Sequence, residues 1–331
     1  MLLPAALAAT FGFIYIVSSA GETLAIKSLN YSPTPIVLPA YTAFMCNQMW
    51  ILMVPLYLCQ KGEATPDKRS YWRDYLGLGV LTFIITILRN ISVNAMPGSV
   101  FALLISTSIV FNMGISRILG RRFNKWHILA AGLCICSAAS IGISAFLTTQ
   151  ESTVGADYSL GVPATLSAAF FVATLTLWQE KLQAGWTNIN HRLVEMALVS
   201  SFTASVLTIV YGVFANELRL WGPSLSVGGS LIIGVSIALP VLKLLIRNSK
   251  YSTIQYSSAF FFEFVQASGS LFASVANILV FGEPWNSGYI VAFICMAASF
   301  AAYTYAKRAK KKTTIVEETP EPIIVVVAPW K

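Results

Sequence analysis

The fold is decided by residues 98–147, which read GSVFALLISTSIVFNMGISRILGRRFNKWHILAAGLCICSAASIGISAFL. Two apolar runs, 98–119 and 126–147, flank a short basic turn at 120–125. Each run is about as long as the 20 residues that a helix needs to cross a hydrocarbon core. The runs are continuous rather than alternating, which excludes the strands of a transmembrane β-barrel. The stretch therefore predicts two membrane-spanning helices joined by a tight turn.

Eight more apolar runs of similar length continue this pattern in both directions. They cover residues 3–25, 35–58, 75–93, 160–179, 193–215, 225–246, 253–281 and 288–305. Five spans fall in residues 1–150 and five in 156–306, and an odd number per half reverses the orientation of the second half. Inverted repeats of this kind are typical of secondary transporters. We predict an all-α integral membrane protein with ten transmembrane helices in two inverted five-helix repeats, and a disordered cytosolic tail at 307–331.

Composition and charge support this class of protein. Only 11% of the 331 residues are charged and 56% are hydrophobic, whereas soluble domains carry about 25% charged residues. With the N-terminus placed in the cytosol, only Lys27, Arg89 and Arg219 of the 22 basic residues fall on the opposite side. This bias predicts that both termini are cytosolic. The net charge of +8 thus follows from topology, and no nucleic-acid partner is expected.

An offset of 162 residues aligns the end of one half with the end of the other. In the last two spans it pairs Gly120 with Gly282, Asn124 with Asn286, Ile128 with Ile290, Ala130 with Ala292, Ser137 with Ser299 and Ala139 with Ala301. One span earlier it pairs Ser106 and Ser108 with Ser268 and Ser270. The offset holds through consecutive spans, so we expect the halves to be duplicated repeats.

Each half closes with an apolar helix, a glycine, a short polar turn and a last apolar helix. The second half has Gly282 followed by Glu283, whereas Arg121 follows Gly120 in the first. This arrangement resembles the drug/metabolite transporter superfamily, whose last helix follows a Gly-Glu pair. Four stretches, 98–104, 111–113, 192–196 and 251–256, are most similar to its chloroquine-resistance-transporter-like branch.

The resemblance implies ten helices, alternating access and a central cavity lined by spans one to four and six to nine. One feature departs from the branch: its best-known members have a long loop with cysteines between spans seven and eight. Here that link, residues 216–222, is short and has no cysteine. A relationship to the nucleotide-sugar or triose-phosphate transporters of the superfamily therefore remains an alternative.

Glu263 is the carboxylate predicted to lie deepest in the membrane. If the ninth span starts near Thr253, Glu263 lies about 15 Å along it, close to the bilayer midplane. Gln266 follows three residues later on the same face. An ionisable residue at this depth is costly and marks a functional site, here one that binds a proton or a cationic substrate. The alternative is a structural carboxyl group that holds helices together.

Other polar residues are weighed by their depth. Arg89 and Asn90 come late in the third span, where they either pair with Glu263, meet an anionic substrate group or reach the outer interface. We expect Glu22 at the outer interface and Lys243 near the inner end of its span. Uncharged side chains complete the predicted cavity wall, unless they only bond helix to helix: Ser18, Asn47, Gln48, Ser106, Ser108, Asn112, Thr174 and Thr176.

These features predict a secondary active transporter that moves a small organic solute by proton-coupled alternating access. Because Glu263 is central and Arg89 is the only deep basic residue, we favour an amino acid, a small peptide or an organic cation. A nucleotide-sugar or sugar-phosphate antiporter and a non-transporting receptor or scaffold are the alternatives. An enzyme is not expected, since no cluster of catalytic side chains lies at one membrane face.

The expected partners are a small-molecule substrate and the lipid bilayer, with a homodimer left open. Neither a metal-ligand spacing nor a cofactor motif is found. The expected location is an endomembrane such as that of the vacuole or the Golgi.

Overall fold

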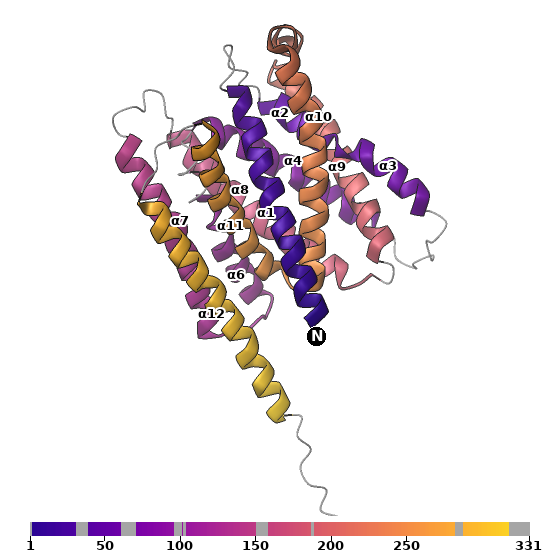
Figure 1. The fold of residues 1–331 in the computed structure, drawn as a ribbon. Coiled ribbons are helices and arrows are strands. Elements are labelled where there is room, and N and C mark those ends of the chain that lie inside the picture. Colours follow the sequence, from indigo (N-terminus) through magenta and orange to yellow (C-terminus); the bar gives the residue numbers. More distant parts are fainter. Residues whose placement is uncertain are drawn as a thin grey trace, which may run out of the picture.

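The structure is a computed structural model that describes residues 2–30, 39–60, 71–95, 101, 104–149, 158–186, 189–281 and 287–317. All the regular elements of these residues are helices, as the continuous apolar runs predict (Figure 1). They are α1 (Leu2–Asn30), α2 (Pro39–Asn47), α3 (Met49–Gln60), α4 (Trp72–Ala95), α6 (Ser108–Ile118), α7 (Lys125–Thr149), α8 (Tyr158–Gln183), α9 (Ile189–Phe214), α10 (Leu218–Tyr256), α11 (Ala259–Phe281) and α12 (Gly288–Glu317).

Seven stretches of the described helices are long and apolar enough to cross a bilayer. They are Ala6–Ile26, Ala40–Cys59, Trp72–Val93, Tyr158–Gln183, His191–Phe214, Ala259–Val280 and Gly288–Ala306. Of the three other predicted spans, 126–147 coincides with α7 and 225–246 lies within α10, while 98–119 falls partly outside the described residues. Large apolar side chains cover the outside of the bundle, as a lipid-facing surface requires; Ile118, Phe214 and Leu279 are examples.

The second predicted span is two helices rather than one. The chain turns at Gln48, where the backbone N–H of Gln48 donates to the carbonyl of Met45 and that of Ile51 donates to the carbonyl of Gln48. The carbonyl of Asn47 accepts a bond from Ser205 Oγ of α9 at 3.1 Å. A carbonyl freed by the interruption is thus satisfied by a neighbouring helix, as a membrane interior demands.

The predicted boundary between spans eight and nine was wrong. Thr253, taken as the start of span nine, lies within α10, which continues to Tyr256. No glycine or proline interrupts the chain between Ile246 and Tyr256, so the helix does not end where the apolar run does. The break falls at Ser257 and Ser258 instead, and Ser258 Oγ accepts the backbone N–H of Phe261 at 3.1 Å in the manner of a helix N-cap.

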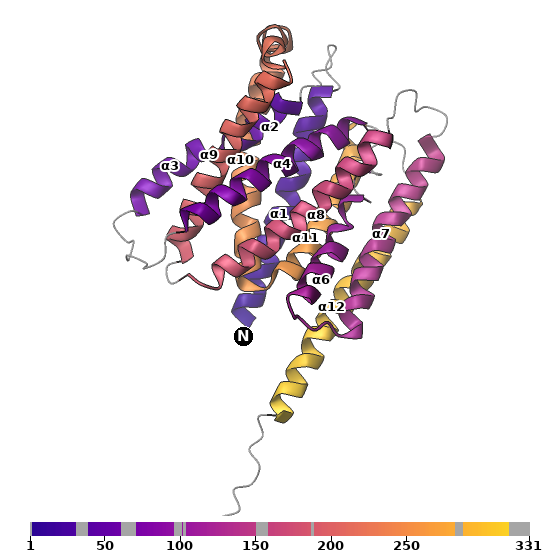
Figure 2. The ribbon, with the colours of Figure 1, turned by 180° about the vertical axis from the view of Figure 1, so that it is seen from behind.

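The helices pack in pairs that repeat when the two halves are exchanged. In the first half α1 packs on α10 and α11; in the second, α8 packs on α4 and α6. α9 packs against α2 and α3, and α7 runs along α12 at one edge of the bundle, with α3 at the opposite edge (Figure 1 and Figure 2).

Two hydrogen bonds between α7 and α12 are reciprocal. Ser137 Oγ donates to the carbonyl of Ala292 at 2.8 Å, and Ser299 Oγ donates to the carbonyl of Ala130 at 2.7 Å. These are the same residues that the 162-residue offset pairs. The two bonds therefore exchange places when each residue is replaced by its counterpart, as in a two-fold interface.

Both described ends of the chain lie at one end of the bundle (Figure 1). α12 continues to Glu317, past the predicted end of the membrane domain at residue 306. Its extension, residues 307–317, contains four lysines and one arginine, residue types that favour helix. Residues 318–331 of the predicted tail lie outside the described residues.

Candidate functional site

A buried carboxylate, Glu263, is the centre of a polar cluster between the two halves. Only 1% of its surface is exposed. Ser108 Oγ of α6 donates to Glu263 Oε2 at 2.6 Å, and Asn112 Nδ2 donates to Oε1 at 3.4 Å. Gln266 Nε2 donates to Ser108 Oγ at 3.4 Å. The structure thus brings together four residues that the sequence predicted for the site: Glu263, Gln266, Ser108 and Asn112.

Glu263 is nearer to a helix end than the sequence suggested. It lies four residues after Ala259, where α11 begins, or about 6 Å along the helix axis. The difference follows from the later start of this helix. Because α10 continues beyond Thr253, however, its last turns lie beside the same cluster, so Glu263 remains enclosed by protein.

Lys250 of α10 is the cation that sequence reasoning missed in this cluster. Its side chain is 9% exposed, it interacts electrostatically with Glu263, and its Nζ lies 5.2 Å from the centre of the Phe262 ring. The predicted boundaries put Lys250 in a cytosolic loop. The absence of any glycine or proline between Ile246 and Ser257 was the signal that the helix, and with it Lys250, continues.

A second charged centre joins α1 to α10. Lys243 Nζ lies 2.5 Å from Glu22 Oε1, and the thiol of Cys46 donates to the same oxygen at 3.8 Å. The sequence placed Glu22 and Lys243 at opposite interfaces, which was wrong. Lys243 precedes the end of α10 by 13 residues, about 20 Å, so the longer helix moves it away from the membrane surface.

One of the sequence hypotheses paired Arg89 with Glu263. The structure does not show this pair. The guanidinium of Arg89 lies over the ring of Phe101, 5.9 Å from the ring centre, and interacts electrostatically with Glu22 and Tyr15. Tyr15 in turn interacts electrostatically with Glu263. Tyr15 therefore lies between the two charged centres, with Arg89 on the side of Glu22.

The other predicted wall residues divide by location. Asn90 and Ser106 are buried. Asn47 lies against α9, where its Nδ2 donates to Thr208 Oγ1 at 3.5 Å. Gln48 and Thr174 donate to the carbonyls of Phe44 and Phe170, each on its own helical segment. Asn47, Gln48 and Thr174 are thus engaged in helix contacts away from Glu263.

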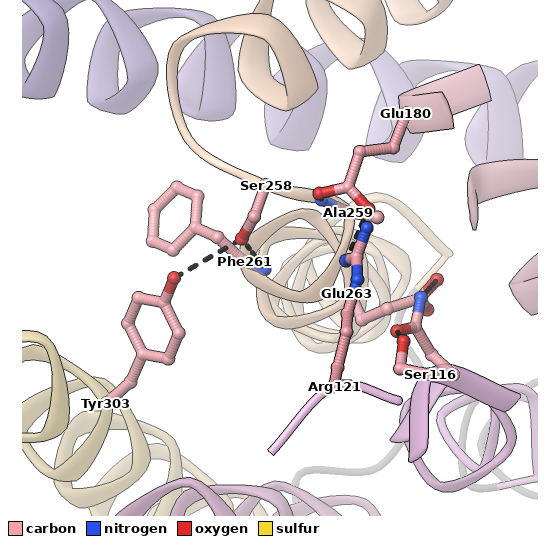
Figure 3. A network of polar contacts seen from close by, with 9 residues as sticks. Ser116, Arg121, Glu180, Ser258, Ala259, Phe261, Glu263 and Tyr303 are labelled. Atoms are coloured by element: carbon pink, nitrogen blue, oxygen red, sulfur yellow. Dashed lines mark hydrogen bonds and ion pairs between the residues drawn. The ribbon is translucent and has the colours of Figure 1, made fainter. Parts of the chain in front are cut away.

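One carboxylate links the two halves at the end of the bundle where α8 ends and α11 begins. Glu180 Oε2 of α8 lies 2.5 Å from Arg121 Nη1, in the connection between α6 and α7. Glu180 Oε1 accepts the backbone N–H of Ala259 at 3.3 Å. Figure 3 shows Arg121 reaching across to Glu180 beside the start of α11, with Tyr303 hydrogen-bonded to Ser258 nearby.

A similar link closes the other end of the bundle, where α9 gives way to α10. Glu217 Oε2 accepts the backbone N–H of Ala40, at the start of α2, at 2.9 Å. Partial burial raises the pKa of Glu217, while the bond from Ala40 acts in the opposite sense. Each end of the bundle therefore has a carboxylate of the second half bonded to the first half.

The chemistry available at this site is recognition and proton binding. It offers a carboxylate, two amides, hydroxyl groups and cations around aromatic rings. In the described part of the chain, no three His, Cys, Asp or Glu side chains are grouped so as to hold a metal ion.

Comparisons with known proteins agree with a transport function. No curated protein matches the chain, whereas 28 chains of solved structures do. One, a crystal structure, has a TM-score of 0.63 and 14% identity over 91% of this chain and 98% of its own, which shows a shared fold. The family PUNUT, described as purine nucleobase transmembrane transport, matches residues 42–313.

The family match confirms the predictions of a membrane transporter and of a protein that is not an enzyme. It does not single out the chloroquine-resistance-transporter-like branch that several stretches resemble. It also names a kind of solute, a purine nucleobase, that the sequence analysis did not consider. The match covers residues 42–313 of 331, so this chain belongs to the PUNUT family of transmembrane transporters.

Proposed function

We propose that this protein is a secondary carrier that moves a purine nucleobase by alternating access, with Glu263 as the group that binds and releases the coupling proton. The observation that carries the proposal is the bonding of Glu263. Its carboxylate is enclosed by protein and accepts bonds from Ser108 and Asn112, which belong to the opposite half. A proton or solute bound there changes the interaction between the halves directly.

A purine suits the groups that surround Glu263. Purines are planar and carry both N–H donors and ring-nitrogen acceptors, so they match a mixture of carboxylate, amide and hydroxyl groups. Tyr15 and Phe262 form an edge-to-face pair with ring centres 4.8 Å apart beside this cluster, and aromatic side chains commonly stack on bases. This proposal replaces the amino acid, peptide or organic cation that the sequence favoured.

Two inverted repeats form the scaffold in this proposal. The exchangeable helix pairs and the reciprocal bonds of Ser137 and Ser299 support it, because a duplicated chain with opposed halves gives each contact a counterpart. The same features are compatible with the drug/metabolite transporter superfamily. The described ends at one side of the bundle agree with an even number of spans and with cytosolic termini; the endomembrane location remains a prediction.

In alternating access, the contacts that close one end of the bundle break while those at the other end stay formed. At one end the link is the ion pair between Arg121 and Glu180; at the other it is the bond from Ala40 to Glu217. Rocking of one repeat against the other around a central site is the usual motion of such carriers. These two links are partly exposed, so each breaks without a large energetic cost.

Transport by the purified protein in proteoliposomes tests the proposal. Labelled adenine, guanine and hypoxanthine are offered with and without an inward proton gradient, with lysine, glutathione and a UDP-sugar as competing solutes. We expect saturable purine uptake that the gradient accelerates and that the other solutes do not inhibit. Uptake of lysine or a UDP-sugar instead of purines would refute the proposed substrate, and purine uptake that ignores the gradient would refute the coupling.

A further inference from the structure

The two charged centres inside the bundle contain more positive than negative side chains. The carboxylates are Glu22 and Glu263, and the cations near them are Arg89, Lys243 and Lys250. Glu22 pairs with Lys243, and Lys250 is the cation nearest to Glu263 by electrostatic interaction. Arg247 interacts electrostatically with Lys250, but its Nη1 already donates to Ser200 Oγ at 3.1 Å. Arg89 and Arg247 are therefore the cations in excess, and protonation of Glu263 during transport increases the imbalance.

Arg89 has no carboxylate within ion-pair distance among the described residues. Among the described residues it lies over the ring of Phe101 and interacts electrostatically with the carboxylate of Glu22 and the hydroxyl group of Tyr15. The side chain is partly exposed, and its Cζ lies over the Phe101 ring. Arginine presents five N–H donors in a rigid planar fork and also stacks on aromatic faces, so a guanidinium held over a ring can recognise a planar acceptor edge.

We infer that Arg89 is a specificity-determining residue that binds the 6-oxo group and N7 of a purine. Arginine makes two parallel bonds to these atoms in guanine, whereas adenine presents a donor N6 amino group beside N7 and repels a second donor. The carrier therefore prefers 6-oxopurines (hypoxanthine, guanine, xanthine) over 6-aminopurines. The inference rests on the proposed purine transport and adds a direction of preference to it.

The excess positive charge supports the same preference. Oxopurines present carbonyl acceptors and lose a proton more readily than adenine, so a site with surplus positive charge favours them. The opposite preference, for amines and other cations, would place like charges near Arg89 and Lys250. This argues against organic cations as substrates. The sequence favoured them because Lys243 and Lys250 were assigned to the membrane surface, which left Arg89 as the only deep cation.

The matched pair of variants is Arg89→Gln and Arg73→Gln. Both arginines are on α4 and both lie over an aromatic ring, Arg73 at 5.6 Å from the centre of the Trp72 ring, but Arg73 is exposed at the far end of the helix. Glutamine can make two bonds to the N6 and N7 atoms of adenine, as arginine does to the O6 and N7 atoms of guanine. Arg89→Lys keeps the charge and removes the two-pronged geometry.

Competition for hypoxanthine uptake is the measurement. In the wild-type carrier we expect the KM for adenine to exceed that for hypoxanthine by about tenfold, the order of one bidentate contact. Arg89→Gln should remove or reverse this ratio, Arg89→Lys should reduce it, and Arg73→Gln should keep it. A wild-type carrier that prefers adenine, or a ratio unchanged in Arg89→Gln, overturns the inference while purine transport stands. If the carrier moves no purine, both the proposed function and the inference about Arg89 are refuted.

Discussion

The seam between α7 and α12 and the cluster around Glu263 are built from aligned parts of the two halves, yet they differ. At the seam the aligned residues do the same thing: Ser137 and Ser299 each donate to the carbonyl of the other helix. At the cluster they do not. Ser108 donates to Glu263, while its counterpart Ser270 donates to the carbonyl of Gln266 on its own helix, and the counterpart of Glu263 is Phe101.

The difference separates scaffold from chemistry. Where helices only pack, the aligned residues make equivalent contacts, because a small side chain that suits one half suits the other. Where a solute is to bind, an equivalent pair of carboxylates would put two like charges close together, so one half supplies the carboxylate and the other its donors. The comparison predicts paired, small effects at the seam and single, large effects at the centre.

The largest effect should come from breaking the central ion pair of Glu22 and Lys243. Lys243→Met leaves a buried carboxylate without its cation, which costs about 3 kcal/mol of stability. Thermal unfolding in detergent measures the loss, with Arg192→Met as control, since the carboxylate that it leaves unpaired, Glu195, is 24% exposed against 6% for Glu22. Adding Glu22→Gln to Lys243→Met should recover part of the stability. Equal losses for Lys243→Met and Arg192→Met would contradict a buried charged centre.

The same Gly→Ala change should have opposite effects at a tight helix contact, between α4 and α9, and on the open face of α7. At Gly79 of α4 a Cβ would lie 2.6 Å from Thr203 Cβ and 2.9 Å from the carbonyl of Ser200, so Gly79→Ala overpacks the contact with α9 by about 1–3 kcal/mol. At Gly132 of α7 nothing lies within 4 Å, so alanine gains up to about 1 kcal/mol of helix propensity. Unfolding temperatures that move in the same direction would break the contrast.

Seam serines should show matched small losses. Ser137→Ala and Ser299→Ala each remove one interhelical bond, worth about 0.6 kcal/mol in a membrane. The two bonds are well separated along the helices, so the double variant should show the sum. Purine uptake should be unchanged in all three variants. Losses of stability that differ several-fold between the two serine variants would show that the two bonds are not energetically equivalent.

The link between Arg121 and Glu180 should give the smallest effect. Arg121 is 44% exposed, so the pair is worth at most about 1 kcal/mol, or about a fivefold shift in population. Arg121→Gln should therefore raise the rate at which an impermeant maleimide labels a cysteine placed at the buried Ser116 beside this link. Arg122→Gln, which changes the exposed neighbouring residue, is the control. Equal labelling rates would show that the pair does not close this end.

Much of the scaffold was predictable from the sequence, and less of the site. Continuous apolar runs indicate helices directly. The 162-residue offset pairs Ser137 with Ser299 as repeat counterparts, but it did not predict that they bond across α7 and α12. Glu263 was recognisable because a carboxylate in an apolar run has few structural explanations. The helix ends were not, since α10 continues through polar residues that a hydropathy pattern assigns to a loop.

That single boundary accounts for the main errors at the centre. With α10 ended too early, Lys243 and Lys250 were assigned to the membrane surface, and Arg89 remained as the only deep cation. Partners across helices, such as Glu22 with Lys243 or Arg121 with Glu180, depend on how helices are rotated against each other. A single sequence contains no direct signal for that rotation.

Comparing exchange with accumulation in Glu263→Gln tests the central claim most directly. Exchange of purine for purine across a vesicle membrane needs no net proton movement, whereas accumulation driven by a pH gradient does. Glutamine keeps the acceptor for Ser108 but binds no proton, so we predict that Glu263→Gln retains exchange and loses gradient-driven accumulation, while Glu195→Gln retains both. Undiminished gradient-driven accumulation by Glu263→Gln would contradict the account.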